Sequence, residues 1–392
     1  MKYIVVLILC TRLVHAQENK PESTWQVDGD HGPYRDLEFS TNEGTWISVD
    51  VAPDGSLAFD LLGHIYTMPY EGGQATALTS GRSWNILPRF SPDGKKLAFT
   101  SDRGGSEDLW TMDRHGGGLT QISDNDDPVF QGSWSRDGRF LIATSFDDKL
   151  VSRSYRFNLY GGKNLLIDGK KGPPGRHFSQ HPTKPLIFFQ VQAGRFPEGG
   201  PGINTYNMQS GETKTYLERP GGAAVPLVSP DGSLMAYVHR DQFNTVLVVH
   251  DLETREERVI CDSLDFGRFE SGAFYGAYSN MSWHPDGEEL VISFGGKIHA
   301  VSVQGTIREI PFTAPVSRRV NETLRFKLNP PDREARTRAH RWAQPTPAGI
   351  LYEVLGDLYL KNGEKVQQLT DTTAHETNPV YDETLQRIIY AS

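Results

Sequence analysis

A short turn motif recurs along this chain and constrains its fold more than any other feature. Five copies place aspartate and glycine after proline or arginine and before an apolar run. Proline fixes one backbone dihedral, aspartate hydrogen-bonds the backbone two residues on, and glycine accepts the left-handed conformation, so each copy predicts a tight turn that starts a β-strand. The five copies begin at Ala52, Ser91, Ser135, Ser229 and His284, and weaker copies begin at His181, Thr346 and Tyr381.

The spacing of the eight copies predicts repeated four-stranded units. Their aspartate positions lie 35 to 62 residues apart, and third-strand and fourth-strand patterns follow most turns, as in GHIYTMPYEGG from Gly63 and the ATALT that comes after it. Units of this length are typical of β-propeller blades, which cannot bury both faces alone and must pack between neighbours. We therefore expect an all-β fold, a β-propeller of seven to eight four-stranded antiparallel blades over residues 34–392, with the last blade incomplete.

Other fold classes fit the sequence less well. The 39 glycines and 24 prolines disfavour a helical bundle, and no stretch shows the sustained helical period that the crossovers of a parallel α/β sheet need. A pair of β-sandwiches is the alternative that remains. The last repeat, from Asn378 to Ser392, stops after its second strand and would leave an unpaired edge. We hypothesise that Tyr34 to Thr41 adds an outer strand to that repeat and fastens the two ends of the ring.

The N-terminal residues have the pattern of a secretory signal. Lys2 precedes an apolar run from Tyr3 to Cys10, and small residues follow before a cleavage point after Ala16. We expect a signal peptide over 1–16, a linker over 17–33 and a secreted protein, periplasmic or extracellular. Cleavage leaves Cys261 as the single cysteine, so no intrachain disulfide is expected. The net charge of −9 argues against nucleic-acid binding. After the N-terminal residues, no apolar stretch reaches the roughly 20 residues that a membrane-spanning helix needs.

The repeats resemble a known family. The phrase FSPDGKKLAFTSDRGGSEDLWTMDRHGGGLTQIS from Phe90 resembles the TolB-type propeller repeat, and stretches from Glu43, Pro88, Gly295 and Arg318 are similar to the N-terminal propeller of large secreted amidohydrolases. That resemblance implies a non-catalytic scaffold for a metal-dependent hydrolase domain that this chain lacks. The alternative is a free-standing TolB-like propeller that binds a protein or peptide at its channel mouth. A third hypothesis is an enzyme whose site is assembled from scattered loop residues.

The sequence contains no catalytic or metal-binding motif that we recognise. The twelve histidines include no His-x-His or His-Glu-x-x-His spacing, and we expect His64 and His299 to be strand or channel residues. No Gly-x-Ser-x-Gly elbow occurs. The run from Asp124 to Asp127 lacks the glycine and distal glutamate of a calcium loop, so we interpret it as a solvated turn. We therefore assign no catalytic residue, metal ligand or cofactor.

A basic segment lies in the longest insertion, near 313–341. The segment from 318 to 341 contains eight basic and three acidic residues. Arginine side chains can bind carboxylates through two parallel hydrogen bonds. We interpret the segment either as a solvated loop paired with acidic neighbours or as a docking surface for an absent hydrolase domain or an acidic partner. Two glycosylation sequons begin at Asn280 and Asn321, of which Asn321 is expected to be the more accessible. The docking candidates are Arg318, Arg319, Arg333, Arg336, Arg338 and Arg341.

Overall fold

The computed structural model describes residues 27–29, 31–123, 127–146, 152–160, 165–166, 175–192, 200–269, 275–322 and 337–392. Every regular element in these ranges is a β-strand, which confirms the all-β prediction. No helix long and apolar enough to cross a membrane occurs in them. The chain divides into two compact units, residues 1–322 and residues 323–392, which we call unit 1 and unit 2.

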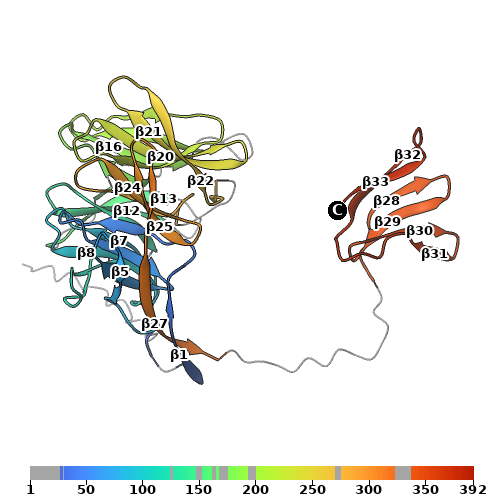
Figure 1. The fold of residues 1–392 in the computed structure, drawn as a ribbon, viewed down its shortest axis with the longest axis horizontal. Helices are drawn as coiled ribbons and strands as arrows, with labels where there is room; N and C mark the ends of the chain where they lie inside the picture. The colour runs from blue at the N-terminus through green and yellow to red at the C-terminus, as the bar shows by residue number, and fades with distance from the viewer. Residues whose placement is uncertain are drawn as a thin grey trace, which may run out of the picture. The chain divides into compact units, whose positions relative to one another are not determined.

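Unit 1 contains six four-stranded antiparallel sheets, blades 1 to 6, each built from strands in chain order (Figure 1). Blade 1 comprises β2 (Val49–Val51), β3 (Leu57–Leu61), β4 (His64–Met68) and β6 (Thr76–Ala77); blade 2 comprises β7 (Asn85–Phe90), β8 (Lys96–Ser101), β9 (Asp108–Asp113) and β10 (Thr120–Gln121); blade 3 comprises β11 (Val129–Trp134), β12 (Phe140–Phe146), β13 (Ser152–Asn158) and β14 (Leu165–Leu166). Blade 4 comprises β15 (Arg176–Gln180), β16 (Leu186–Gln192), β17 (Pro201–Asn207) and β18 (Thr213–Leu217); blade 5 comprises β19 (Ala223–Val228), β20 (Leu234–Asp241), β21 (Asn244–Asp251) and β22 (Glu257–Leu264); blade 6 comprises β23 (Ser282–Trp283), β24 (Glu289–Phe294), β25 (Lys297–Ser302) and β26 (Ile307–Ile310).

The six blades close into a ring because blade 6 packs against blade 1. Val49 and Phe59 of blade 1 share one buried core with Val291 and Ile298 of blade 6. The backbone N–H of Val49 also donates to the carbonyl of Asn280, 3.3 Å away. Five of the six neighbouring pairs of first strands are in contact, all except β19 with β23, so these strands lie nearest the axis and line the central channel.

The recurring aspartate-glycine motif forms the turn between the first and second strands, as predicted. The Asp93 Oδ1 accepts a hydrogen bond from the N–H of Lys95 at 3.1 Å, and the same bond two residues on is made by Asp54, Asp137, Asp231 and Asp286. The glycine that follows each aspartate has a positive φ between 67° and 88°. The turn chemistry read from the sequence thus fixes five of the six hairpins.

A β-bulge interrupts the first strand of blades 2 to 5, and at most of these bulges a backbone group bonds to the preceding blade. Leu87, Gln131, His177 and Val225 have φ between 49° and 60°, and the strand register shifts at each of them. At three of these bulges the freed backbone N–H donates to a side chain of the preceding blade, for example Leu87 N to Asp60 Oδ2 at 2.7 Å. Because the bulge rotates the backbone, it also re-aims the side chains that line the channel.

A three-stranded sheet ties blade 6 to blade 1. Strand β27 (Phe312–Asn321) follows blade 6, buries alternate residues in the core of blade 1 and pairs with β5 (Gly73–Gln74). Strand β1 (Tyr34–Thr41) pairs with β27 along its whole length (Figure 1). The hypothesis that β1 completes the last repeat is therefore wrong. The apolar side chains of β27 pack on blade 1, which leaves one backbone edge of β27 available for pairing within unit 1. Strand β1 pairs with that edge.

Unit 2 contains the remaining repeats. Its four-stranded sheet comprises β28 (Arg341–Thr346), β29 (Gly349–Val354), β30 (Asp357–Asn362) and β31 (Lys365–Gln368), and its two-stranded sheet comprises β32 (Thr377–Asp382) and β33 (Arg387–Ala391). Besides the three-stranded sheet, the described residues thus form seven four-stranded sheets and one incomplete, two-stranded sheet, in agreement with the predicted seven to eight blades. The structure describes units 1 and 2 separately, so the single propeller expected over 34–392 stays a prediction. The predicted insertion near 313–341 begins as β27.

Candidate binding site at the propeller channel

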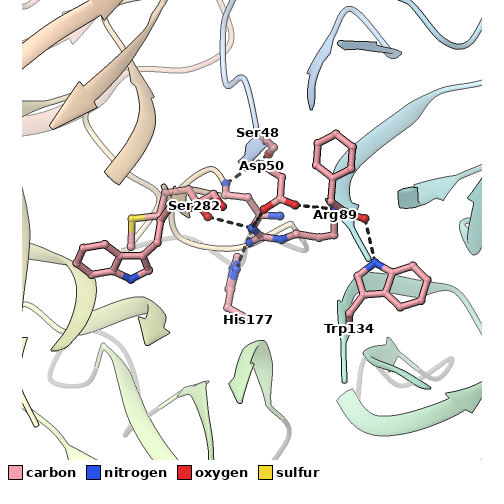
Figure 2. Close-up of polar contacts among 10 residues, drawn as sticks. Ser48, Asp50, Arg89, Trp134, His177 and Ser282 are labelled. Atoms are coloured by element: carbon pink, nitrogen blue, oxygen red, sulfur yellow. Dashed lines mark hydrogen bonds and ion pairs between the residues drawn. The ribbon is translucent and has the colours of Figure 1, made fainter. Parts of the chain in front are cut away.

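An ion pair joins three blades at the channel wall. Arg89 on β7 donates from Nη1 to Asp50 Oδ1 on β2 at 2.9 Å and also to the carbonyl of Met281, beside blade 6, at 2.9 Å. The Trp134 indole on β11 donates to the Arg89 carbonyl at 2.9 Å (Figure 2). The Asp50 and Arg89 side chains are only 10% and 15% exposed, so each largely neutralises the charge of the other.

A neutral histidine lies deeper in the same wall. His177 on β15 is buried, and its Nδ1 lies 3.1 Å from Asn280 Oδ1 while its Nε2 lies 3.2 Å from Gln131 Nε2. The partners assign the tautomer, with Nδ1–H donating to Asn280 and Nε2 accepting from Gln131. Burial, assisted by nearby arginines, lowers the pKa of His177 to about 3. The ring is therefore uncharged at neutral pH and acts as a hydrogen-bonding bridge between blades.

The connection between blades 5 and 6 covers one side of this histidine. A Cβ added to Gly276 would lie 2.2 Å from His177 Nε2, so the backbone approaches the ring as closely as only glycine permits. The neighbouring Tyr275 packs its ring on Phe130 with centroids 5.4 Å apart and donates from its hydroxyl to Glu107 at 3.4 Å. Residues that leave blade 5 thus reach blades 2, 3 and 4 at the channel.

A pocket of about 320 Å³ lies along the channel wall formed by blades 1 to 5. Its lining includes Asp50, Arg89, Trp134, Arg136 and His177. Two further hollows, of about 550 Å³ and 410 Å³, lie on either side of the turn of blade 3, and Arg136 lines both. Arg136 is exposed, and among the described residues its side chain has no ion-pair partner. Arg136 therefore lines all three hollows.

The polar side chains that line this pocket are largely engaged in contacts within unit 1. Asp50 is paired with Arg89, and both nitrogens of His177 are used in hydrogen bonds to Asn280 and Gln131. Within the described ranges no three histidine, cysteine or carboxylate side chains gather as metal ligands would. What the site offers a ligand is one free guanidinium, aromatic surface and an adjacent hollow.

Two of the predicted docking arginines lie on β27 and make contacts within unit 1. Arg318 donates to the carbonyls of Ser83 and Arg82 at 3.2 and 3.1 Å, and it stacks on the Trp84 ring. Arg319 pairs with Asp36 of β1 at 2.9 Å. These contacts hold β27 in place, and the docking surface stays a prediction.

The other sequence-predicted residues are dispersed. Arg338 is exposed and Arg341 stacks on Trp342, both in unit 2, whereas Arg333 and Arg336 lie outside the described residues, as do residues 1–16 and Asp124 to Asp126. Asn321 is exposed at the end of β27, and Asn280 is 3% exposed. His64 and His299 lie on the third strands β4 and β25, as expected. Burial lowers the pKa of both, to about 4 for His64.

The sequence patterns did not indicate the residues that line the channel. Arg89, Gln131 and His177 precede a repeat turn by two to four residues, at a position where the other repeats vary between polar and apolar. The available signal was a polar residue inside an otherwise apolar first strand. That signal could not be read without knowing that these strands face one channel.

Comparisons with known proteins agree with this architecture. Residues 38–194 match the family model described as the TolB beta propeller domain. The uncharacterized peptidase YuxL of Bacillus subtilis is 27% identical over 184 residues, which are 44% of this chain and 24% of that protein. This chain therefore matches about a quarter of the length of that curated relative.

Two solved structures share the fold. TolB from Acinetobacter baumannii aligns with a TM-score of 0.52 and 19% identity, over 69% of this chain and 66% of that one. The tricorn protease aligns with a TM-score of 0.53 and 14% identity, over 89% of this chain and 35% of that one. At these identities the likeness concerns the fold alone.

Proposed function

We propose that this TolB-like β-propeller is a non-catalytic scaffold that binds a carboxylate-bearing peptide segment at Arg136, which lines all three hollows. The single observation that carries the proposal is an exposed guanidinium that lines all three hollows and has no ion-pair partner among the described residues. Arginine binds carboxylates through paired, directed hydrogen bonds, so such a position favours an acidic segment over a neutral one.

The surroundings of Arg136 support a peptide ligand. The three hollows are lined by five basic and three acidic side chains, an excess of two positive charges on a chain whose net charge is −9. Tyr160 is 85% exposed and Met208 is 41% exposed at their rims. Aromatic and methionine surface next to arginine is the composition typical of protein interfaces. An extended segment with alternating acidic and apolar side chains fits both properties.

We further propose that the scaffold serves a secreted protein of the amidohydrolase type. The resemblance of the repeats to the propellers of such proteins supports this proposal, and so does a matched relative that is named a peptidase and is much longer than the match. In this hypothesis the propeller orients substrate for a hydrolase domain. The alternative is a free-standing propeller with the same peptide site.

A peptide selection tests the binding site. Random twelve-residue peptides are selected on the full chain, and their affinities are measured by fluorescence anisotropy. Acidic peptides are expected, and Arg136→Glu should weaken them at least tenfold. The control is Lys214→Glu, an equal charge change at an exposed outer strand. Peptides without carboxylates, or equal affinity for both variants, would refute the assignment.

Two observations test the wider hypothesis. Coding sequence downstream of Ser392 that encodes a His-x-His motif supports the amidohydrolase assignment, whereas a stop codon supports the free-standing alternative. The purified chain should not hydrolyse N-acyl amino acids or dipeptides with or without added zinc, and robust turnover would contradict the scaffold proposal. Mass spectrometry of exported protein should find Gln17 at the N-terminus.

A further inference from the structure

The turns between first and second strands pack on one another in a repeated way. In four of the five successive pairs of blades in unit 1, the proline of one turn lies against the glycine of the next turn. A Cβ built on that glycine would lie 2.5 to 3.7 Å from the proline ring. The four pairs are Pro53 with Gly94, Pro92 with Gly138, Pro182 with Gly232 and Pro230 with Gly287.

The junction between blades 3 and 4 lacks both members of this pair. Arg136 stands at the proline position of blade 3, and blade 4 has Thr183 and Lys184 where the other turns have aspartate and glycine. Blade 3 therefore has no proline ring to place here, and blade 4 has no glycine to receive one. The hollow of about 410 Å³ lies at this junction, and we call it the junction hollow.

Blade 3 supplies one wall of the junction hollow. Ile142 on β12 pairs with Arg156 on β13, and Phe140 lies two residues before Ile142, so the three side chains share one face of the sheet. The Arg156 guanidinium lies over the Phe140 ring, 4.5 Å from its centroid. Arg156 is exposed, and in the part of the chain that the structure describes it makes no ion pair.

Blade 4 supplies the opposite wall. Ile187 on β16 pairs with Tyr206 on β17, and Met208 follows two residues later. Ile142 and Ile187 are 6% and 3% exposed and belong to one buried cluster, against which Tyr206 packs. Met208 is 41% exposed. The core between the two blades is thus the apolar floor of the hollow, and Met208 lies at its rim.

Gln180 on β15 holds the rim together. Its Oε1 accepts the backbone N–H of Arg136 at 3.1 Å, and its Nε2 lies 3.8 Å from the Met208 sulfur. The turn that carries Arg136 is therefore tied to blade 4. The carboxylate that lines the hollow belongs to Asp137, and it pairs with Arg139 at 2.7 Å. The Arg136 guanidinium therefore stays available to a ligand.

We propose that the junction hollow is the specificity pocket of the peptide site, and that it takes one aromatic side chain with a carboxylate within two residues on each side. Arg136 binds one carboxylate and Arg156 binds the other. This inference rests on the proposed function, because Arg136 anchors the segment in both.

The composition and size of the hollow support this ligand. Tyrosine, methionine and arginine around a buried apolar floor are typical of the pockets that carry most of the binding energy at protein interfaces. A volume of about 410 Å³ lies near the lower end of the range for ligand pockets, which suits one large side chain and its neighbours. Two guanidinium groups at the edge favour acidic neighbours over neutral or basic ones.

Three fluorescently labelled peptides test the pocket by anisotropy on the full chain. The first is GSGEFEGSG, the second has alanine in place of phenylalanine, and the third has glutamine in place of both glutamates. The alanine peptide should bind roughly tenfold more weakly than the first, because the apolar contact is lost. This comparison changes only the peptide, so it does not depend on the folding of a variant.

Two variants of the chain test the walls. Met208→Trp fills the rim and should weaken the phenylalanine peptide roughly tenfold while leaving the alanine peptide unchanged. Val259→Trp, at a 52% exposed position on β22, is its control and should change neither affinity. Arg156→Gln should weaken the first peptide about threefold and leave the glutamine peptide unchanged, and Lys214→Gln on the exposed outer strand of blade 4 is its control.

Arg136→Glu separates this inference from the proposed function. If it weakens the glutamate peptides while the alanine peptide, Met208→Trp and Arg156→Gln all behave as the unchanged pair does, the specificity pocket is refuted and the proposed function stands. If Arg136→Glu has no effect on peptides that bind, both fail. Absence of saturable binding of the phenylalanine peptide at about 1 mM also overturns the inference, and the peptide selection then decides the proposed function.

Discussion

Asp60 allows a quantitative test of how the first two blades are joined. This buried carboxylate on β3 accepts the N–H of Ser48 at 2.9 Å within blade 1 and the N–H of Leu87 at 2.7 Å from blade 2. Burial raises the pKa of Asp60 to about 7, although the two N–H groups act in the opposite direction. We expect Asp60→Asn to change how the stability of unit 1 depends on pH.

The sign follows from proton linkage. Between pH 4 and pH 7 the folded state retains the Asp60 proton that the unfolded chain, with its ordinary pKa of 3.8, has released. Stability therefore falls as pH rises through this window and is level above it. At about 1.4 kcal/mol per pKa unit, a window of about three units gives an upper bound of about 4 kcal/mol, and about 2 to 3 kcal/mol between pH 5 and pH 7.5.

Urea unfolding followed by tryptophan fluorescence at pH 5, 6, 7 and 8 measures this difference. The free energy of wild type minus that of Asp60→Asn should decline across the series, because all other titrating groups cancel. Asp231→Asn is the control, since hydrogen bonds from Ser229 and Ser233 lower the pKa of Asp231 and leave it ionised in both states throughout the series. Parallel profiles for wild type and Asp60→Asn would show that the N–H groups outweigh burial, and the reasoning would fail.

Three further predictions concern packing and accessibility. Trp134→Phe removes an indole donor to a carbonyl of the neighbouring blade and should cost about 0.5 to 1.5 kcal/mol in urea unfolding, and an unchanged midpoint would contradict the role of that bond. Gly221→Ala places a Cβ 1.9 Å from a backbone oxygen and should lower the melting temperature clearly more than Gly211→Ala, which has a similar φ and open space. Equal losses would show that strain, not the clash, dominates. In a glycosylating host, Asn321 should carry the glycan and buried Asn280 none, so that Asn321→Gln alone removes the added mass detected by mass spectrometry.

The repeat could be identified from the sequence because its turn depends on hydrogen bonds between residues that are close in the chain. Asp93 needs only the backbone two residues ahead to form its hydrogen bond, and a glycine at positive φ needs no distant partner. The all-β class, the seven four-stranded sheets and the incomplete last sheet followed from counting such turns. Residues with a local role were therefore assigned correctly without a structure.

The candidate site depends on contacts between residues far apart in the chain. Arg89 contacts Met281, and His177 contacts Asn280, across separations of 192 and 103 residues. No spacing rule indicates these pairs, since each arises only when six blades bring their first strands around one axis. For the same reason the basic residues Arg318 and Arg319 looked available in the sequence and prove to be held by Ser83 and Asp36.

The sequence by itself determined the unit of this protein, a four-stranded hairpin pair opened by an aspartate-glycine turn, because hydrogen bonds within a few residues define it. Only the tertiary structure decided how many units close a ring and where β1 pairs. Ring closure depends on the angle between packed blades, and that angle is set by side chains such as Phe59 and Val291, which meet from opposite ends of unit 1.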